Sequence, residues 1–262
     1  MAKQTESAII KQLRQKVMYS CRIMGDRGVT RGSFGHVSAR IPGTDKILIK
    51  SKGPDEAALE FTTEKDIITL DMHGKVLQAP KGLGAPNETA MHLAVYRARP
   101  EVMSVIHAHP DWVVALTASE KPLLPIYAAY NPPGLRLVLE GIPLYPRSVT
   151  IVDDELGADF IKVMGDKNVC LLIGHGITTA GRSVEEVTLT TLNLFELARL
   201  NYLAYAIGNP KPIPAQDIEE YTRRWKRNPG RTQVSTDREH PDWRYFKKLL
   251  GKKLPINISA RN

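Results

Sequence analysis

Several absences narrow the function classes open to this chain of 262 residues. No apolar run reaches the roughly 18 residues that a membrane-spanning helix needs, so no membrane partner is expected. The chain has two cysteines, Cys21 and Cys170, which lie in apolar surroundings far apart in sequence. We expect buried thiols and not a disulfide scaffold. Residues 1–21 are charged and lack the apolar segment of a secretory signal, which predicts a cytoplasmic protein. Neither a G-x-G-x-x-G nor a P-loop pattern occurs.

Charge is nearly balanced except at the C-terminal end. The net charge is +8, and residues 210–262 hold 13 Lys and Arg against 6 Asp and Glu, a surplus of seven. A basic tail can indicate a nucleic-acid partner, but no groove-reading motif is present, so none is expected. The same tail carries Trp225, Trp243, Tyr245 and Phe246. This mixture predicts an extension that packs on its own or a neighbouring subunit.

Hydrophobic periodicity predicts strands linked by turns, with helices before, between and after them. Helices are expected over 5–28, 87–100, 111–119, 155–166 and 183–209, and strands within 35–43, 46–53, 66–78, 102–110 and 169–181. Asn87 is expected to cap the second helix, and Ser183 with Glu186 to form a capping box at the last. The Pro-rich stretch 122–152 is expected to form loops and short strands. The pattern predicts an α/β fold, a mainly antiparallel sheet between helices, over a domain of residues 1–209.

Two histidines stand one residue apart in "SVIHAHPDW", residues 104–112. Side chains alternate faces along a strand, so His107 and His109 are expected to point the same way and could chelate one metal ion. The alternative is a pair of strand-end histidines without a ligand. A third histidine, His175, lies between two glycines at the end of an apolar stretch, where a backbone or a ligand can approach closely.

Glu88 lies in the first turn of its predicted helix, where the helix dipole favours a carboxylate. His92 follows four residues later on the same helix face. This pair could share a hydrogen bond or supply two metal ligands, and neither reading is preferred by the spacing alone.

The order Glu88, His107-x-His109, Gly-His175-Gly, together with "GSFGHVSAR", "ILIKSKG" and "LLIGHGITTAGRSVEEV", resembles the class II aldolase/adducin family. The resemblance covers the chain to about residue 208 and implies that family's three-layer fold. It implies one divalent metal ion per subunit (Mn, Zn, Fe or Co), bound by the three histidines. It further implies that Glu88 is either a displaceable fourth ligand or the acid/base, that His92 braces the helix, and that the protein is a homotetramer.

Three short stretches depart from the members of this family that act on sugar phosphates. Those proteins usually carry Gly-Asn-x-Ser where this chain has Gly-His36-Val-Ser38, and Thr-Gly where it has Lys52-Gly53. They usually have two serines before the Glu, where this chain has Pro and Asn87. The hydroxyls that would bind a phosphate are therefore mostly missing. His36, Lys52 and Arg40 would instead suit carboxylates.

A branch of the same family decarboxylates hydroxylated aromatic or pyridine dicarboxylates. The sequence therefore predicts a lyase, a metal-dependent decarboxylase of a dihydroxyphthalate-like acid in aromatic catabolism. The predicted catalytic residues are Glu88 and His36. The predicted substrate-binding residues are Lys52, Gly53, Ser38, Asn87 and Arg40. The alternatives are an aldolase of a non-phosphorylated hydroxy-keto or sugar substrate and, from another class, a non-catalytic adducin-like binding module.

Overall fold

The computed structural model describes residues 2–227 and 239–251 of the chain. In this part an eight-stranded sheet has the order β4-β3-β2-β1-β5-β8-β7-β6. Every neighbouring pair is antiparallel except β6 and β7, which confirms the predicted mainly antiparallel sheet. The strands are β1 (His36–Arg40), β2 (Lys46–Lys50), β3 (Ile67–Asp71), β4 (Val76–Gln78), β5 (Ser104–Ala108), β6 (Leu144–Tyr145), β7 (Val169–Leu172) and β8 (Gly176–Gly181).

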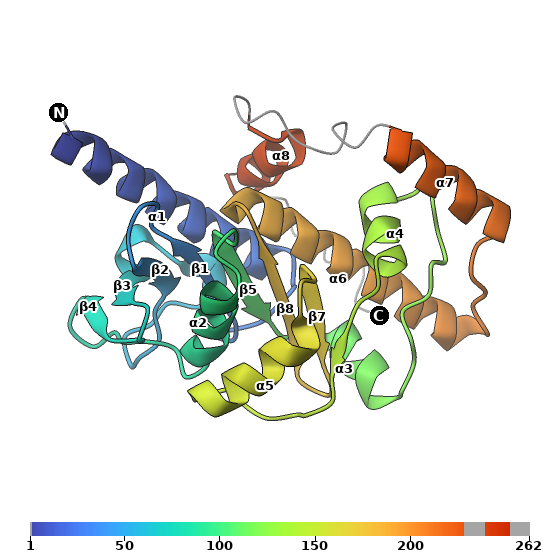
Figure 1. The fold of residues 1–262 in the computed structure, drawn as a ribbon, viewed down its shortest axis with the longest axis horizontal. Coiled ribbons are helices and arrows are strands. Elements are labelled where there is room, and N and C mark those ends of the chain that lie inside the picture. Colours follow the sequence, from blue (N-terminus) through green and yellow to red (C-terminus); the bar gives the residue numbers. More distant parts are fainter. Residues whose placement is uncertain (1, 228–238, 252–262) are drawn as a thin grey trace, which may run out of the picture.

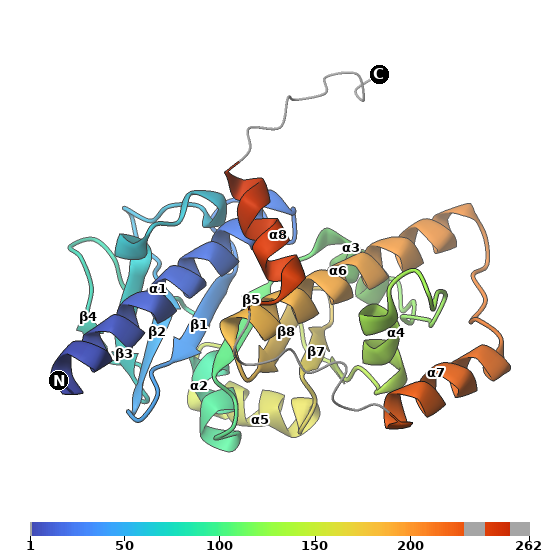
Figure 2. The ribbon, with the colours of Figure 1, turned by 90° about the horizontal axis from the view of Figure 1, so that it is seen from above.

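Helices cover both faces of this sheet, which gives the three layers expected (Figures 1 and 2). On one face α1 contacts β1 and β2, and α6 contacts β5 and β8; on the other α2 contacts β5, and α5 contacts β6 and β7. The helices are α1 (Ala2–Asp26), α2 (Thr89–Ala98), α3 (Asp111–Ala118), α4 (Pro132–Leu139), α5 (Asp154–Met164), α6 (Val184–Ile207), α7 (Ala215–Arg227) and α8 (Pro241–Leu250), with short 3-10 turns at Leu59–Phe61 and Glu64–Asp66. Among the described residues, no helix combines the length and apolarity that crossing a bilayer would require.

Local chemistry explains where α6 starts. The Ser183 side chain accepts a hydrogen bond from the backbone N–H of Glu186, which confirms the expected N-cap. The Glu186 carboxylate accepts from the backbone N–H of Arg182, one residue earlier than a strict capping box would require. The bond to Ser183 satisfies an N–H group that the first turn would otherwise leave unpaired.

Two expectations about helices were wrong. Residues 132–139 form α4, inside the Pro-rich stretch 122–152 that was expected to form loops and short strands. The Asn131 side chain accepts from the N–H of Gly134, and two prolines occupy the first turn, where their missing N–H groups cost nothing. Asn87 does not cap α2, because the helix begins at Thr89 and the N-cap position is Glu88, which makes no side-chain capping bond.

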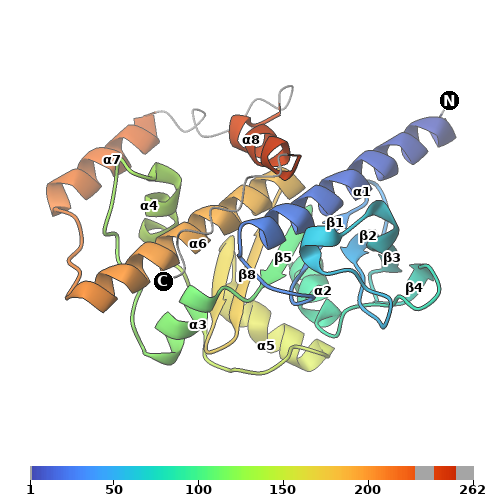
Figure 3. The same cartoon turned by 180° about the vertical axis from the view of Figure 1, so that it is seen from behind.

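The C-terminal extension contains two helices that the periodicity analysis did not predict. Helix α8 contacts α1 and α6 of its own chain, and Trp243 is 1% exposed within the core on that face. Helix α7 buries none of its residues and lies beside α4 (Figure 3). The parts of the predicted extension at 228–238 and 252–262 lie outside the described residues.

Candidate metal centre

Three separate segments bring one glutamate and three histidines together. His107 is in β5 and His109 directly follows that strand, while His175 lies in the turn between β7 and β8. Glu88 immediately precedes α2. One ligand atom from each of these four residues lies within 4.8 Å of every other. The structure therefore places the predicted ligands in one group, which we call the Glu/His₃ group.

The distances within the Glu/His₃ group are those of atoms that surround a common point. The Nε2 atoms of His107 and His109 are 2.7 Å apart. Glu88 Oε2 lies 3.1 Å from His107 Nε2 and 3.9 Å from His109 Nε2, and Glu88 Oε1 lies 3.5 Å from His175 Nε2. The backbone N–H of Ile151 donates to Glu88 Oε1 at 3.3 Å, which orients the carboxylate.

Glycine is needed beside His175, as its position in the sequence suggested. A Cβ on Gly176 would lie 2.3 Å from the carbonyl oxygen of Ala108, so only glycine lets β8 come this close to β5. Gly174 has a φ of +58°, in the left-handed region that glycine adopts readily. Together these glycines bring His175 against the end of β5.

The donor set fits a divalent metal ion. His107 Nδ1 donates to the carbonyl oxygen of Ile177 at 2.9 Å, so its Nε2 carries a lone pair toward the group. Three such nitrogens and a carboxylate would repel one another unless a cation lay among them. Imidazole nitrogen with one carboxylate oxygen suits Zn, Mn, Fe or Co. The hydrogen bond from His107 to Ile177 is the supporting contact that metal-binding histidines usually make.

The ionisation of the group agrees with this arrangement. Burial followed by the rings of His107 and His175 lowers the pKa of His109 to about 3, so the ring is neutral near pH 7. Burial alone would raise the pKa of Glu88, but the neighbouring His107, His175 and His36 outweigh it and hold the pKa below its ordinary value. Glu88 is therefore a carboxylate when the group binds an ion.

His36, a predicted catalytic residue, lies next to this group. It pairs with His107 across β1 and β5, and the centroids of the two rings are 5.3 Å apart. His36 Nδ1 is 2.8 Å from His92 Nε2. His92 therefore contacts His36; it is not part of the Glu/His₃ group and forms no hydrogen bond with Glu88. Burial, then the His107 ring, lowers the pKa of His92 to about 3.

The predicted substrate-binding residues Lys52, Gly53 and Asn87 lie on or beside the segment that leads to Glu88. Lys52 exchanges two backbone hydrogen bonds with Gly84, a few residues before Glu88, and its side chain is exposed. Its charge is among the influences that lower the pKa of His109, after burial and two histidine rings. A Cβ on Gly53 would lie 2.2 Å from the carbonyl oxygen of Gly82, and Asn87 is exposed.

Arg40 and Ser38 are not brought to the metal group. The Arg40 guanidinium, at the far end of β1, donates to the carbonyl oxygens of Tyr96 and Val102. Ser38 is fully buried and hydrogen bonds to His92 and Tyr96. Both residues support the residues around the group and do not line an open space.

Phe34 lies beside the Glu/His₃ group, and the sequence analysis did not single it out. Its ring is 54% exposed, and its centroid lies 5.6 Å from that of His109. The Thr30 hydroxyl donates to the Phe34 carbonyl oxygen, which fixes this short loop before β1. The signal was present in "GSFGH", where an apolar ring stands in a loop of small residues directly before His36.

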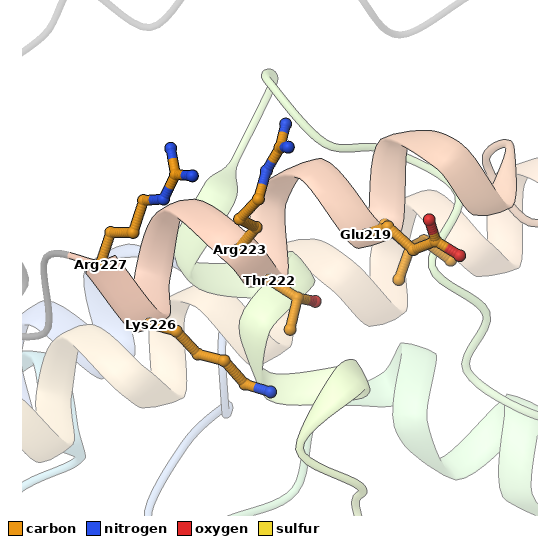
Figure 4. A pocket seen from close by; sticks show the side chains of 6 residues that line it. Glu219, Thr222, Arg223, Lys226 and Arg227 are labelled. Atoms are coloured by element: carbon orange, nitrogen blue, oxygen red, sulfur yellow. The ribbon is translucent and has the colours of Figure 1, made fainter.

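A surface hollow runs along α7, and it shares no lining residue with the Glu/His₃ group. It is lined by Ile218, Glu219, Thr222, Arg223, Lys226 and Arg227, none of which is a predicted site residue. Figure 4 shows the Arg223 and Arg227 side chains on one side of the helix and Lys226 on the other.

Comparison with known proteins gives the same family that the motifs of the sequence resemble. Residues 15–202 match the family model described as the class II aldolase and adducin N-terminal domain. A 3,4-dihydroxyphthalate decarboxylase of Arthrobacter keyseri is 37% identical over 79% of this chain and 85% of its own. An L-fuculose phosphate aldolase of Methanococcus maripaludis is 30% identical over 70% of this chain and 92% of its own. A solved aldolase II superfamily structure from Pseudomonas syringae superposes with a TM-score of 0.75 at 22% identity, over 91% of this chain and 90% of its own. The chain therefore belongs to the class II aldolase and adducin family.

Proposed function

We propose that this chain is a divalent-metal-dependent carboxy-lyase acting on a hydroxylated aromatic dicarboxylate of the 3,4-dihydroxyphthalate type. The observation that carries the proposal is the complete Glu/His₃ group in a chain 37% identical to a 3,4-dihydroxyphthalate decarboxylase. A role in aromatic catabolism, a cytoplasmic location and a homotetrameric assembly belong to the same proposal.

The reaction replaces a carboxylate on an aromatic ring by a proton. The bond from the ring to the carboxylate carbon breaks, CO₂ leaves, and the electron pair stays with the ring and its hydroxyl oxygen until the carbon is protonated. A metal ion (Zn, Mn, Fe or Co) held by His107, His109, His175 and Glu88 would act as a Lewis acid on a substrate oxygen. Glu88 and His36 both lie beside His107, and we assign to them the holding or delivery of the proton.

The surroundings of the metal group suit the carboxylates and the ring of such a substrate. Lys52 supplies an exposed positive charge, and His36 supplies a ring nitrogen. Asn87 adds an exposed amide on the Glu88 side. Phe34 offers an exposed aromatic face beside His109, on which a planar ring can stack.

An aldolase is the alternative, because the same metal group can stabilise the oxyanion formed when a carbon–carbon bond to an aldehyde breaks. The 30% identity with an L-fuculose phosphate aldolase favours this reading. Against a phosphorylated substrate, His36, Lys52 and Asn87 stand where the resemblance predicts groups that bind phosphate. An adducin-like binding module would have no use for four converging metal ligands.

A side-by-side assay tests this ranking. The purified protein, loaded separately with Zn and Mn, is incubated with 3,4-dihydroxyphthalate and with L-fuculose 1-phosphate, and CO₂ and aldehyde release are measured. We expect CO₂ release and little aldehyde. Efficient cleavage of the sugar phosphate, with no CO₂ from the aromatic acid, would favour the aldolase function over the decarboxylase function. The His36→Asn variant, which introduces the aldolase residue, should lose CO₂ release while keeping its metal.

A further inference from the structure

A chain of three hydrogen bonds leads from Tyr96 in α2 to His36 at the metal group. The Tyr96 hydroxyl is 2.7 Å from Ser38 Oγ, Ser38 Oγ is 2.6 Å from His92 Nδ1, and His92 Nε2 is 2.8 Å from His36 Nδ1. All four residues are buried, with exposed fractions of 8% or less. The residues come from β1 and α2, so the contacts tie the sheet to the helix that follows Glu88.

Counting donors and acceptors shows which group donates in each of these three hydrogen bonds. Ser38 Oγ is the only acceptor that the described residues offer to the Tyr96 O–H, so Tyr96 donates to Ser38. Ser38 can then donate to His92 Nδ1 at 2.6 Å or to the carbonyl oxygen of Val105 at 3.4 Å, and the shorter bond is favoured. His92 therefore carries its proton on Nε2 and donates to His36 Nδ1. A neutral His36 whose Nδ1 accepts must carry its proton on Nε2.

Arg40 secures the far end of this chain. Its guanidinium lies 5.0 Å from the centroid of the Tyr96 ring and donates to the Tyr96 carbonyl oxygen. The contact holds Tyr96 where its hydroxyl reaches Ser38. It gives a physical role to a residue that does not reach the metal group itself.

We propose that Tyr96, Ser38 and His92 are positioning residues that hold His36 as the neutral tautomer with its proton on Nε2. His36 is then a fixed hydrogen-bond donor, and it binds an anionic carboxylate oxygen of the aromatic substrate. Naming that ligand rests on the proposed function, whereas the tautomer does not. A neutral imidazole N–H is a very weak acid, so His36 stabilises the oxygen without giving up its proton. Of the two candidates, proton delivery to carbon then falls to Glu88, which as a carboxylate would take the proton of the substrate hydroxyl and pass it to the ring carbon as CO₂ leaves.

The tautomer can be measured without any turnover. Two-bond ¹H–¹⁵N correlation spectra of the Zn-loaded, ¹⁵N-labelled full chain show which ring nitrogen of each histidine carries the proton, with His36→Asn used for assignment. We expect His36 to carry it on Nε2 in the wild type. Ser38→Ala and Tyr96→Phe remove links in the chain, so both should give a mixture of His36 tautomers. A His36 protonated on Nδ1 in the wild type, or an unchanged tautomer in Ser38→Ala, would overturn the proposal.

Matched controls distinguish the effect of breaking the hydrogen-bond chain from the effect of removing any buried hydroxyl. Ser20→Ala removes a fully buried serine hydroxyl bonded to Thr188, and Tyr145→Phe removes the hydroxyl of a buried tyrosine bonded to Asp159. Both should leave the His36 tautomer as in the wild type. If either control gives the same mixture as Ser38→Ala, the effect is structural and the proposal fails.

Binding of phthalate, a non-hydroxylated dicarboxylate, tests the ligand by calorimetry on the Zn-loaded protein. Ser38→Ala and Tyr96→Phe should raise the Kd for phthalate about 3- to 10-fold, as expected when one hydrogen bond to a charged group weakens. Ser20→Ala and Tyr145→Phe should not change it. Equal Kd values in all five proteins, or no binding to the wild type, would overturn the ligand assignment and leave the tautomer result standing. Failure of the decarboxylase proposal would appear separately, as absence of CO₂ release.

Discussion

Phe34 is the residue that best separates an aromatic from a sugar substrate. It is an exposed phenylalanine 5.6 Å, centroid to centroid, from the ring of a proposed metal ligand, His109. Replacing it by leucine keeps an apolar side chain but removes the aromatic face. Aromatic pairs contribute about 0.5–1.5 kcal/mol beyond burial, so the KM for 3,4-dihydroxyphthalate should rise about 2- to 10-fold. Phe61→Leu, at another exposed phenylalanine, is the control and should leave KM unchanged. Equal KM values in both variants would show that the Phe34 ring does not contribute to substrate binding.

We expect Lys52 to act through its charge, so its contribution to catalysis should depend on salt. The Lys52→Ala variant should lose roughly 1–3 kcal/mol in kcat/KM, the range for a hydrogen bond to a charged group, and the lower end is expected because the side chain is exposed. Raising the ionic strength should narrow the gap between wild type and variant. Lys46→Ala, an exposed lysine at the other end of β2, is the control. A gap that does not change with salt would contradict an electrostatic role.

The candidate metal ligands could be found from the sequence because their order along the chain resembles that of the class II aldolase/adducin family. The H-x-H pattern at β5 and the glycines beside His175 also had physical reasons that the structure repeats. The position of Glu88 did not, because Glu88 precedes α2 and does not lie in its first turn. The contacts of His36 with His92 and of Ser38 with Tyr96 could not be found this way. They depend on how β1 packs against α2, which no single segment encodes.

At the scale of elements, α7 and α8 differ although both belong to the basic extension. Trp243 of α8 is 1% exposed in the core, so Trp243→Ala should lower the free energy of unfolding by about 3–5 kcal/mol, as for other buried aromatic residues. Trp225→Ala in α7, a helix that buries no residue, should change it far less. Urea unfolding of both variants measures the difference. Equal losses would contradict the different packing of the two helices.

The misread element α4 shows why composition alone is an uncertain guide. Prolines interrupt a helix only beyond its first turn, and in α4 both stand at the start, after the capping Asn131. The helix is held from outside by α6, through contacts such as the hydrogen bond between the Asn131 and Asn193 side chains. Such long-range support leaves no trace in the periodicity of residues 132–139.

At the scale of the whole molecule, the buried His92 makes stability depend on pH. Its pKa in the folded state is about 3, below the ordinary value near 6.5, because the ring is buried and close to His107. Above pH 6.5 the ring is neutral in both states and contributes nothing. Below it the unfolded chain takes up a proton that the folded chain does not, so stability falls as the pH drops from 6.5 toward 3.

Urea unfolding at pH 7.5 and pH 5 measures this loss. His92→Gln should lose less stability between the two values than the wild type, by up to about 2 kcal/mol. His73→Gln, at an exposed histidine, should lose as much as the wild type. Metal release in acid affects all three proteins and cancels in the comparison. The same loss in all three would show that His92 does not carry the effect.

Metal content tests the central claim, that three histidines and one glutamate from three segments bind a single divalent ion. The measurement is elemental mass spectrometry on protein purified without chelators and supplied with Zn and Mn during expression. We predict close to one ion per chain in the wild type and in His73→Ala, and at least a tenfold loss in His107→Ala, because His107 touches both His109 and Glu88. Full metal content in His107→Ala, or a wild type that binds no ion, would contradict the account.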